Sequence, residues 1–356
     1  MKTLKTYIQE SILDDIETNI AKGDFDVAKA AIDEFIQQNF INTKYTISKK
    51  PNKDGKYIVK SRGEVILRRT ATTLTNDVFI WGSCKTLTCR FNEGLKNLIG
   101  APIKAKEIYL TGCYNLESFE GCPYEDVQFI TANGCGIKNL IGLPANYTGQ
   151  LSLTECENLI SLEGCPQQLD RLSVSQCKNL ATLEGGPKIV KGTFDCSGCD
   201  KLTSLKGAPT STGNFLCNKC NGLKTFAGAP ETVTISFTGS YCKNVESLDV
   251  PYMEVARNFA CDWCDKLKSY EGAPKSIGDT FNGSDCPLVT SLKGLPETLN
   301  GLYAVSTGLT SLEGCPKKVG KNSSIIGVFD IHNTPGNISK KDILDVCNVN
   351  PNNIVI

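Results

Sequence analysis

The spacing of the cysteines is the first feature of this sequence that could support chemistry. Cys196 and Cys199 form one Cys-x-x-Cys pair, and Cys217 and Cys220 form a second pair after 17 intervening residues. Four thiolates at such a spacing can bind one zinc ion, as in zinc ribbons. However, both positions recur along the chain, and the first is leucine or valine in other copies. Residues that alternate with leucine belong in a core, so we expect no metal and no other cofactor.

Catalytic motifs are also scarce. His332 is the only histidine, and no cysteine or serine motif stands beside it. The sequence contains no Gly-x-Ser-x-Gly nucleophile elbow, no His-Glu-x-x-His zinc motif and no phosphate-binding P-loop. Its carboxylates are scattered over positions that are expected at the surface. These observations favour a protein without enzymatic activity.

A sequence repeat explains the cysteine spacing. The segment from Pro187 to Pro209 reads φ-x-φ-x-x-Cys-x-x-Leu-x-x-Leu-x-Gly-x-Pro, where φ is apolar, and related segments run from about residue 86 to about residue 316. The prolines that close the copies lie 20–23 residues apart, at positions 102, 123, 144, 166, 187, 209, 230, 251, 274, 296 and 316. A repeat of this length with this leucine spacing is typical of a leucine-rich-repeat solenoid. We therefore expect about eleven stacked repeats.

Each copy predicts a short strand with two inward side chains. The first inward column is expected to consist of Leu87, Ile108, Phe129, Leu151, Leu172, Phe194, Phe215, Phe237, Phe259 and Phe281. Its five consecutive phenylalanines should stack at the strand spacing of about 4.8 Å. The cysteine column follows, with Asn92 in the first copy and Ser306 in the last, whereas in the third copy Gly134 holds the column and Cys135 is displaced by one. Here the chain leaves the strand, so these side chains should hydrogen-bond backbone groups.

The outward strand positions form the usual ligand face of this architecture. Their central row is expected to contain Thr88, Tyr109, Ile130, Ser152, Ser173, Asp195, Leu216, Thr238, Ala260, Asn282 and Leu302. Six of these form the candidate interaction surface: Tyr109, Ile130, Asp195, Leu216, Asn282 and Leu302. The flanking rows are mostly Ser, Thr and Asn, without the Trp, Tyr and Arg cluster of a protein hot spot or the basic stripe of a nucleic-acid site. Two interpretations stay open: a solvated sheet face, or a broad surface for weak or multivalent contacts.

The sequence predicts four regions. Residues 1–43 have two helical patterns, over 4–20 and from Asp24 onward, and form either a packed cap or an acidic docking segment. Residues 44–85 form a basic, strand-rich N-terminal cap with a turn at 51–55, and residues 86–320 form the solenoid. Residues 321–356 form a C-terminal cap, with a capping box at Ser339 that opens a helix through Val346, then a strand at 354–356. The fold class is an α/β repeat solenoid that is mostly β, with parallel strands on the concave face and an extended or 3₁₀ convex side.

Charge narrows the range of partners. The 38 basic and 38 acidic residues give a net charge of zero, so we expect neither nucleic acid nor a membrane as a partner. Residues 44–69 hold nine basic and two acidic residues. Because no nucleic-acid-binding motif accompanies them, we interpret them as a lysine-protected strand edge or a face that pairs with the acidic helices. No run approaches 18 apolar residues, and a column of identical thiols is safest in a reducing compartment, which indicates the cytoplasm.

The repeat also carries a resemblance. The motif Ile108-x-Leu110-x-x-Cys113-x-x-Leu116 resembles cysteine-containing leucine-rich-repeat proteins, and the endings SLEGCP, SLKGAP and SLEGGP look like those of repeat proteins from tailed bacteriophages and some bacteria. The opening MKTLKTYIQESILDDIE is similar to short segments shared by phage and Bacteroides-type proteins. The resemblance implies a phage-encoded module for protein–protein interaction, acting in the host cytoplasm or in the virion, with a phage or host protein as partner. The alternative is a surface- or tail-associated adhesin that binds glycan through its Ser/Thr/Asn face.

Overall fold

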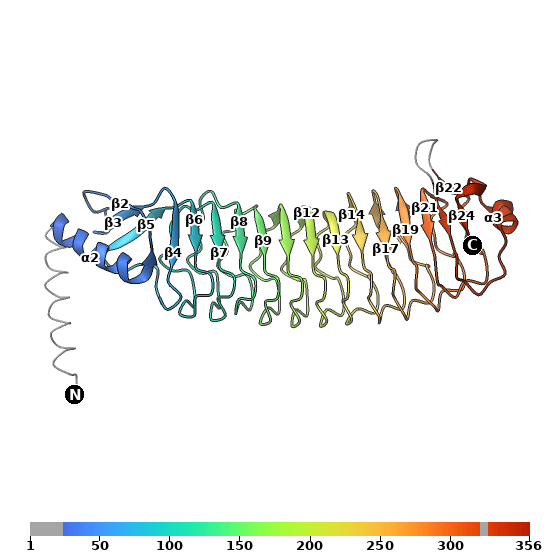
Figure 1. Cartoon of the computed structure of the whole chain (residues 1–356), viewed down its shortest axis with the longest axis horizontal. Helices are drawn as coiled ribbons and strands as arrows, with labels where there is room; N and C mark the ends of the chain where they lie inside the picture. The colour runs from blue at the N-terminus through green and yellow to red at the C-terminus, as the bar shows by residue number, and fades with distance from the viewer. Residues whose placement is uncertain (1–23, 321–326) are drawn as a thin grey trace, which may run out of the picture. The chain divides into compact units, whose positions relative to one another are not determined.

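The computed structural model describes residues 24–320 and 327–356. The chain divides into two compact units, Met1–Gly149 and Gln150–Ile356, and each is a mostly β structure built on a ladder of short parallel strands (Figure 1). The helix predicted over residues 4–20 lies outside the described residues. No helix within the two described ranges is long and apolar enough to cross a membrane.

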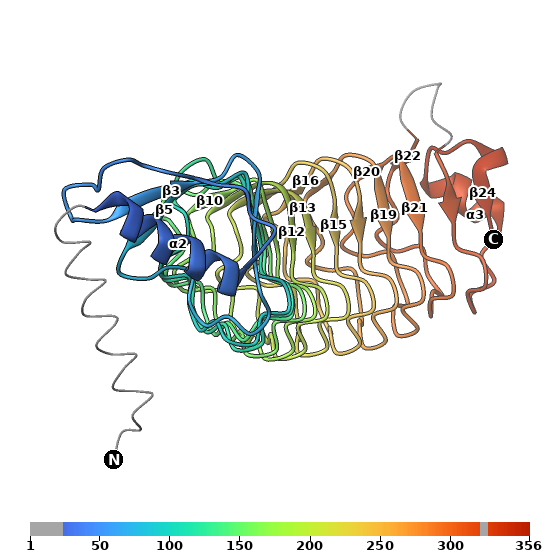
Figure 2. The ribbon, with the colours of Figure 1, turned by 60° about the vertical axis from the view of Figure 1, so that its left-hand side comes forward.

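The first unit opens with helix α2, Phe25–Asn39. It begins where predicted, because Asp24 is its N-cap and the carboxylate accepts the N–H groups of Asp26 and Val27 at 3.0 and 3.3 Å. The helix buries a stripe of three residues, Ala28, Ile32 and Ile36. It lies beside strands β3 and β5 of the same unit (Figure 2).

Short strands make up the rest of the first unit. They are β1 (Phe40–Ile41), β2 (Thr46–Ile47), β3 (Tyr57–Lys60), β4 (Glu64–Leu67), β5 (Phe79–Ser83), β6 (Thr86–Thr88), β7 (Glu107–Tyr109) and β8 (Phe129–Thr131). The predicted hairpin is confirmed, since β2 and β3 pair antiparallel around a turn in which Gly55 has φ +76°. Strands β4, β6, β7 and β8 pair in parallel, so this ladder begins one strand before residue 86.

The outer edge of this ladder is covered. Strand β1 pairs antiparallel with β4 and so occupies the edge that β4 would otherwise expose. Behind this pair, Phe35, Phe40, Phe79 and Trp81 contact one another at ring-centroid distances of 5.3–6.3 Å. The Trp81 indole N–H donates to the carbonyl of Leu74 at 2.9 Å. Residues 25–83 therefore form a cap with an aromatic core of its own.

The second unit carries two strands on most of its coils (Figure 2). One parallel ladder joins β9 (Gln150–Ser152), β11 (Arg171–Ser173), β12 (Ile189–Asp195), β13 (Ser211–Leu216), β15 (Phe237–Thr238), β17 (Phe259–Ala260), β19 (Thr280–Asn282), β21 (Gly301–Tyr303), β23 (Phe329–Asp330) and β24 (Ile354–Val355). A second ladder joins β10 (Gln168–Leu169), the first halves of β12 and β13, β14 (Thr232–Val233), β16 (Glu254–Val255) and β18 (Ser276–Ile277). Strands β20 (Thr298–Leu299) and β22 (Lys318–Val319) pair in the same way.

The predicted phenylalanine stack forms in the second unit. Phe194, Phe215, Phe237, Phe259 and Phe281 are fully buried, and neighbouring ring centroids lie 4.8–5.9 Å apart with interplanar angles of 1–11°. Parallel strands in register place identical side chains one above another, so the stack follows directly from the repeat.

The predicted C-terminal cap is also present. Helix α3, Lys340–Val346, starts with the expected capping box between Ser339 and Asp342. A 3₁₀ turn at Pro351–Asn353 leads into β24, which pairs with β23. Among the described residues this is the only 3₁₀ segment, so the connections within the coils are turns and extended chain.

Candidate functional site

Four of the six predicted surface residues lie on the outward row. In the first unit Tyr109 is half-buried beneath Arg90, whose guanidinium carbon lies 4.4 Å from the ring centroid. In the second unit Asp195, Leu216 and Asn282 are half-buried on β12, β13 and β19. Asp195 and Asn282 accept hydrogen bonds from the backbone N–H groups two residues onward, at 2.9 and 3.1 Å. The side chains of Asp195 and Asn282 therefore stabilise the ends of their own strands.

The outward placement of Ile130 was wrong. Strand pairing matches Ile130, and not Phe129, to Ile108, so Ile130 is 1% exposed while Phe129 is 39% exposed. A shift of one residue turns each side chain of a strand to the other face. The same shift brings Cys135 back into the cysteine column, and it places Gly134 before that column.

The outward placement of Leu302 was wrong for the same reason. Leu302 pairs with Phe281 and is fully buried, while Tyr303 occupies the outward row between Asn282 and Asp330. The last member of the cysteine column is then Thr307 and not Ser306. Thr307 donates its hydroxyl hydrogen to the carbonyl of Ala304 at 2.9 Å.

The cysteine column holds the coils together through hydrogen bonds. Eight of its thiols donate to a backbone carbonyl of the preceding coil at 2.9–3.5 Å: Cys113, Cys135, Cys177, Cys199, Cys220, Cys242, Cys264 and Cys286. Asn92 opens the column and donates to the carbonyls of Arg68 and Ala71 at 2.7 and 2.8 Å. The predicted role of this column is confirmed.

The Cys-x-x-Cys pairs belong to this structural column. Burial raises the pKa of Cys199 and Cys217 well above the ordinary value. A hydrogen bond between Cys196 and Cys220 raises the pKa of Cys196 and lowers that of Cys220. The three buried thiols with a raised pKa remain protonated and are poor metal ligands. Within the described residues no three His, Cys, Asp or Glu side chains form a group that could hold a metal ion. All eighteen cysteines, which lie in the described ranges, are free thiols.

The polar side chains of the outward face are largely engaged with one another. The hydroxyl oxygens of Thr154, Ser173 and Ser175 form three pairs, and the two oxygens of every pair lie 3.3 Å apart. Ser240 donates to the carboxylate of Asp262 at 2.5 Å.

His332 lies in the terminal cap with its Nδ1 2.7 Å from a carboxylate oxygen of Asp330.

The most exposed aromatic pair lies outside the predicted outward row, on a different row of residues. This row, which we call the αL row, comprises the residues directly before the cysteine column; in the second unit they are Glu155, Gln176, Gly198, Lys219, Tyr241, Trp263, Asp285 and Ser306. All have φ between +53° and +72°. Tyr241 and Trp263 are 41% and 44% exposed, and their rings stack with centroids 5.5 Å apart and an interplanar angle of 3°.

Charged groups flank this aromatic pair. The ammonium of Lys219 lies 5.8 Å from the centroid of the Tyr241 ring on one side. On the other side Asp285 follows Trp263 in the row, and Asp262 is the residue before Trp263. Burial and the neighbouring Asp262 raise the pKa of Asp285. The αL row thus presents a cation, two aromatic rings and an acidic end on successive coils.

A sequence signal for this row exists. Gly112, Gly134 and Gly198 occupy it in other coils, and a glycine directly before a turning column indicates a left-handed backbone. The other members of the row in the second unit are glycine or polar residues, so a tyrosine and a tryptophan are its only aromatic members there. Phe91 is an aromatic member of the row in the first unit, with φ +56° and 45% exposure.

Comparison of the chain with protein-family models, curated proteins and solved structures gave no match.

Proposed function

We propose that the protein is a non-enzymatic interaction module and that it binds a protein partner through the αL row of the second unit. The observation that carries this proposal is the exposed Tyr241–Trp263 pair. A left-handed conformation costs a bulky L-residue roughly 1–2 kcal/mol, and glycine would serve the turn at these positions without that cost. The other non-glycine residues of this row in the second unit are polar, so two large rings left exposed here point to a function other than folding.

The chemistry of the row supports a protein partner. Trp and Tyr are the residues most enriched in protein hot spots, where rings enter apolar pockets of the partner. The acidic end at Asp262 and Asp285 favours a partner with a cationic side chain beside its apolar contact. The partner of this row is thus expected to combine an apolar or aromatic surface with a neighbouring Lys or Arg.

The glycan-binding adhesin remains the second candidate. It is favoured by the flat stacked rings and the hydroxyl-rich strand face. However, the hydroxyls of Thr154, Ser173 and Ser175 already hydrogen-bond one another. A sugar would have to displace these contacts, so the protein partner is the better supported of the two.

The setting of the interaction is also a proposal. Eighteen free thiols are compatible with a reducing compartment. Together with the resemblance to phage repeat proteins, this supports a phage-encoded protein that acts in the host cytoplasm or in the virion. Addition of dithiothreitol should leave the thermal unfolding midpoint unchanged; a fall in that midpoint would contradict the reducing compartment.

The tryptophans provide a direct test of the proposed surface. Trp81 is 1% exposed, whereas Trp263 is 44% exposed, so acrylamide quenching of tryptophan fluorescence reports mainly on Trp263. The full chain is first used to capture partners from source-cell and virion lysates, and each purified candidate is then titrated. A true partner should protect Trp263 from quenching and should bind the Tyr241→Ala/Trp263→Ala variant at least about tenfold more weakly, as expected for hot-spot residues.

A matched variant distinguishes this surface from others. Tyr114 is 67% exposed in the first unit and stacks on no ring that the structure describes. Tyr114→Ala should leave partner affinity unchanged. Equal binding by wild type and the double variant would refute the proposed surface, and saturable protection of Trp263 by an oligosaccharide alone would favour the adhesin.

A further inference from the structure

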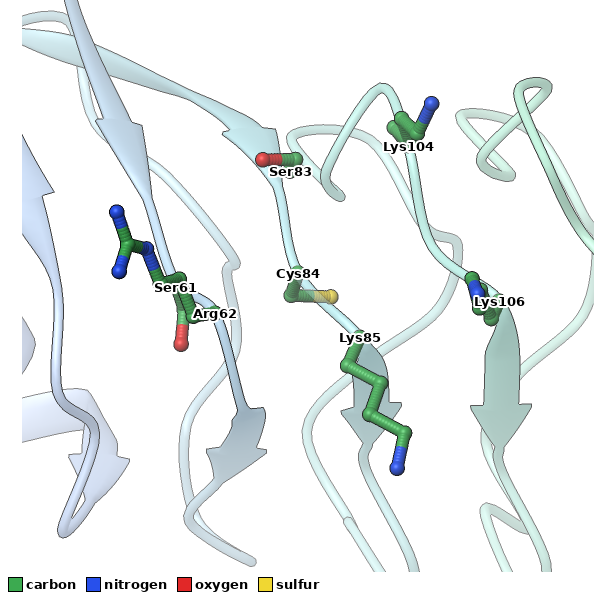
Figure 3. A pocket seen from close by; sticks show the side chains of 7 residues that line it. All are labelled: Ser61, Arg62, Ser83, Cys84, Lys85, Lys104 and Lys106. Carbon is green, nitrogen blue, oxygen red and sulfur yellow. The ribbon is translucent and has the colours of Figure 1, made fainter.

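A basic pocket in the first unit has no role in the function proposed above. Its cavity measures about 370 Å³ and is lined by Ser61, Arg62, Ser83, Cys84, Lys85, Lys104 and Lys106 (Figure 3). Pockets that hold small ligands span roughly 300–1,000 Å³, so this one suits a compact ligand.

Three neighbouring chain segments build the pocket. They precede β4, β6 and β7, and backbone hydrogen bonds fix them side by side. Ser61 N–H donates to the Ser83 carbonyl at 2.8 Å, Cys84 N–H donates to the Lys104 carbonyl at 2.9 Å, and Lys106 N–H donates to the Lys85 carbonyl at 2.9 Å. Regular backbone pairing therefore sets the positions from which the side chains project.

The lining consists of cations and hydrogen-bond donors. Four of the seven residues are Arg or Lys, two are serines, and no carboxylate lines the cavity. The Ser61 hydroxyl oxygen accepts the Gly63 N–H at 3.2 Å, which leaves its own hydrogen to donate. Burial raises the pKa of the Cys84 thiol to about 12, so it adds no negative charge at neutral pH. The pocket is thus chemically suited to an oxyanion.

Half of the described lysines of the second unit pair with an acid on an adjacent coil. In the second unit eight lysines lie within 4 Å of an acid on the adjacent coil: Lys178, Lys191, Lys206, Lys224, Lys268, Lys275, Lys293 and Lys317. In the first unit Lys138 pairs in the same way with Glu117 at 3.5 Å. Each pair contributes little energy. The other eight described lysines of the second unit, Lys188 and Lys201 among them, make no ion pair.

The pocket gathers three basic side chains that have no acidic partner within 4 Å among the described residues. Within the described part of the chain, Arg62, Lys85 and Lys106 make no ion pair. Lys85 and Lys106 precede paired positions of β6 and β7, so their backbones are about one strand spacing, ~4.8 Å, apart. Both side chains therefore project from adjacent coils. Lys106 also acts on Asp126 of the following coil, because Lys104 and then Lys106 lower the pKa of that carboxyl.

The basic cluster is short. In the next coil Gln128 stands where Lys106 stands, because Glu107 pairs with Phe129. Lys104 forms an ion pair with Asp126 at 2.5 Å, and this lysine lowers the pKa of the Asp126 carboxyl. A polymer backbone would need a longer row of cations, so the cluster fits a compact anion better than a nucleic acid.

We propose that this pocket binds a small phosphate-bearing anion that carries at least two negative charges. Arg62 supplies a planar fork of N–H donors that matches phosphoryl oxygens, and Lys85 and Lys106 supply point charges from adjacent coils. The serine hydroxyls complete the donor set. The site is independent of the Tyr241–Trp263 surface, so either assignment can fail alone.

Calorimetric titration of the full chain with inorganic pyrophosphate tests the proposal. Lys85→Gln/Lys106→Gln should weaken pyrophosphate binding at least about tenfold, because two charge-assisted hydrogen bonds are lost. Lys138→Gln removes an exposed lysine of the same unit that lies outside the pocket and pairs with Glu117. This variant should change affinity less than about twofold. The pocket variant should also lose the rise in thermal midpoint that pyrophosphate gives the wild type.

Further probes separate the sources of the phosphate group. Adenosine diphosphate stands for a free phosphate ester, vesicles with phosphatidic acid stand for a lipid head group, and a single-stranded oligonucleotide stands for nucleic acid. Binding of pyrophosphate or adenosine diphosphate that the pocket variant loses and Lys138→Gln keeps supports the proposal. No saturable binding of either, equal loss in Lys138→Gln, or binding only of vesicles or the oligonucleotide overturns it.

Discussion

The second unit contains two aromatic stacks that share a geometry and differ in environment. In the interior, five phenylalanines stack at 4.8–5.9 Å and are fully buried. On the surface, Tyr241 and Trp263 stack at 5.5 Å with more than 40% of each side chain exposed. The parallel ladder produces both stacks, because it brings equivalent residues of adjacent coils together.

The two stacks differ in what the backbone demands of them. The interior residues are in ordinary strand conformation, and burial of each ring stabilises the fold. The surface residues have φ +61° and +58°, which disfavours large side chains. The interior stack is therefore explained by folding alone. The surface stack works against local preference, and this contrast underlies the proposed binding role.

The largest expected effect is on the interior stack. Phe237 contacts Phe215 and Phe259 face to face, and Phe226 meets it edge-on at 5.2 Å. Phe237→Ala should lower the free energy of unfolding by about 3–5 kcal/mol, because it removes buried area and leaves a cavity. Urea unfolding followed by circular dichroism measures this loss.

Two variants in the first unit control for that result and test the corrected register. Phe129→Ala removes an exposed ring and should cost less than about 0.5 kcal/mol. Ile130→Ala removes a buried side chain and should cost about 2–5 kcal/mol. The opposite order would restore the original assignment of the third repeat.

The next effect concerns how the interior stack is packed. Gly239 occupies the second inward column, where the neighbouring coils carry Cys217 and Cys261. A Cβ at Gly239 would lie 2.5 Å from the buried ring of Phe226. Gly239→Cys should therefore destabilise the protein by roughly 1–3 kcal/mol through overpacking.

A second substitution should reverse that loss. Phe226 stands where other coils have leucine, so Phe226→Leu returns the space that a cysteine needs. In a double-mutant cycle the two changes should couple favourably by about 0.5–3 kcal/mol. Additive losses in urea unfolding would show that the glycine serves another purpose. Tyr270 and Gly283 repeat this combination, because a Cβ at Gly283 would lie 2.5 Å from the Tyr270 ring. The unit therefore contains two places where an aromatic ring replaces leucine and a glycine replaces the neighbouring inward side chain.

These examples show why most of the fold could be predicted from the sequence. Inward columns repeat at a constant period, so the phenylalanine stack, the hydrogen-bonding cysteine column and the capping box at Ser339 could all be assigned. The second ladder could have been found too, since an apolar residue such as Val190 or Val233 stands three positions after the proline. Errors arose where two apolar residues were adjacent, as at Phe129 and Ile130, because hydrophobicity alone does not decide which one faces inward.

The candidate sites were harder to predict for a physical reason. Side chains alternate between the two faces of a sheet only within a strand. Tyr241 and Trp263 lie beyond the strand ends, so the direction of their side chains depends on a left-handed turn and not on this alternation. The basic pocket joins residues 61–62, 83–85 and 104–106, which come together only through the parallel pairing of β4, β6 and β7. No local pattern marks such a juxtaposition.

A smaller effect is expected at the surface stack. Trp263→Gly should change the free energy of unfolding by less than about 1 kcal/mol, because relief of the left-handed strain offsets the lost stacking, worth ~0.5–1.5 kcal/mol. Trp263→Val should be clearly more destabilising, since β-branched residues fit this conformation poorly. Unfolding curves and partner affinity are measured on the same samples. Full stability of Trp263→Gly with reduced partner affinity would separate the two roles, whereas a large loss of stability would make the surface stack structural.

The smallest expected effect is electrostatic and concerns the acidic end of the row. Burial and Asp262 raise the pKa of Asp285 above its unfolded value, near 3.9, while His332 opposes the shift. A carboxyl with a raised folded pKa favours folding when protonated, and that contribution is lost as pH rises through the folded pKa. Asp285→Asn should therefore raise the unfolding midpoint slightly at pH 7 and leave it unchanged below about pH 3.9. Partner affinity should fall in the same variant at pH 7, because the cation-binding end of the row is lost. If the variant is less stable than wild type at pH 7, Asp285 is held by an attractive contact, and the acidic end would then be part of the fold and not of the binding surface.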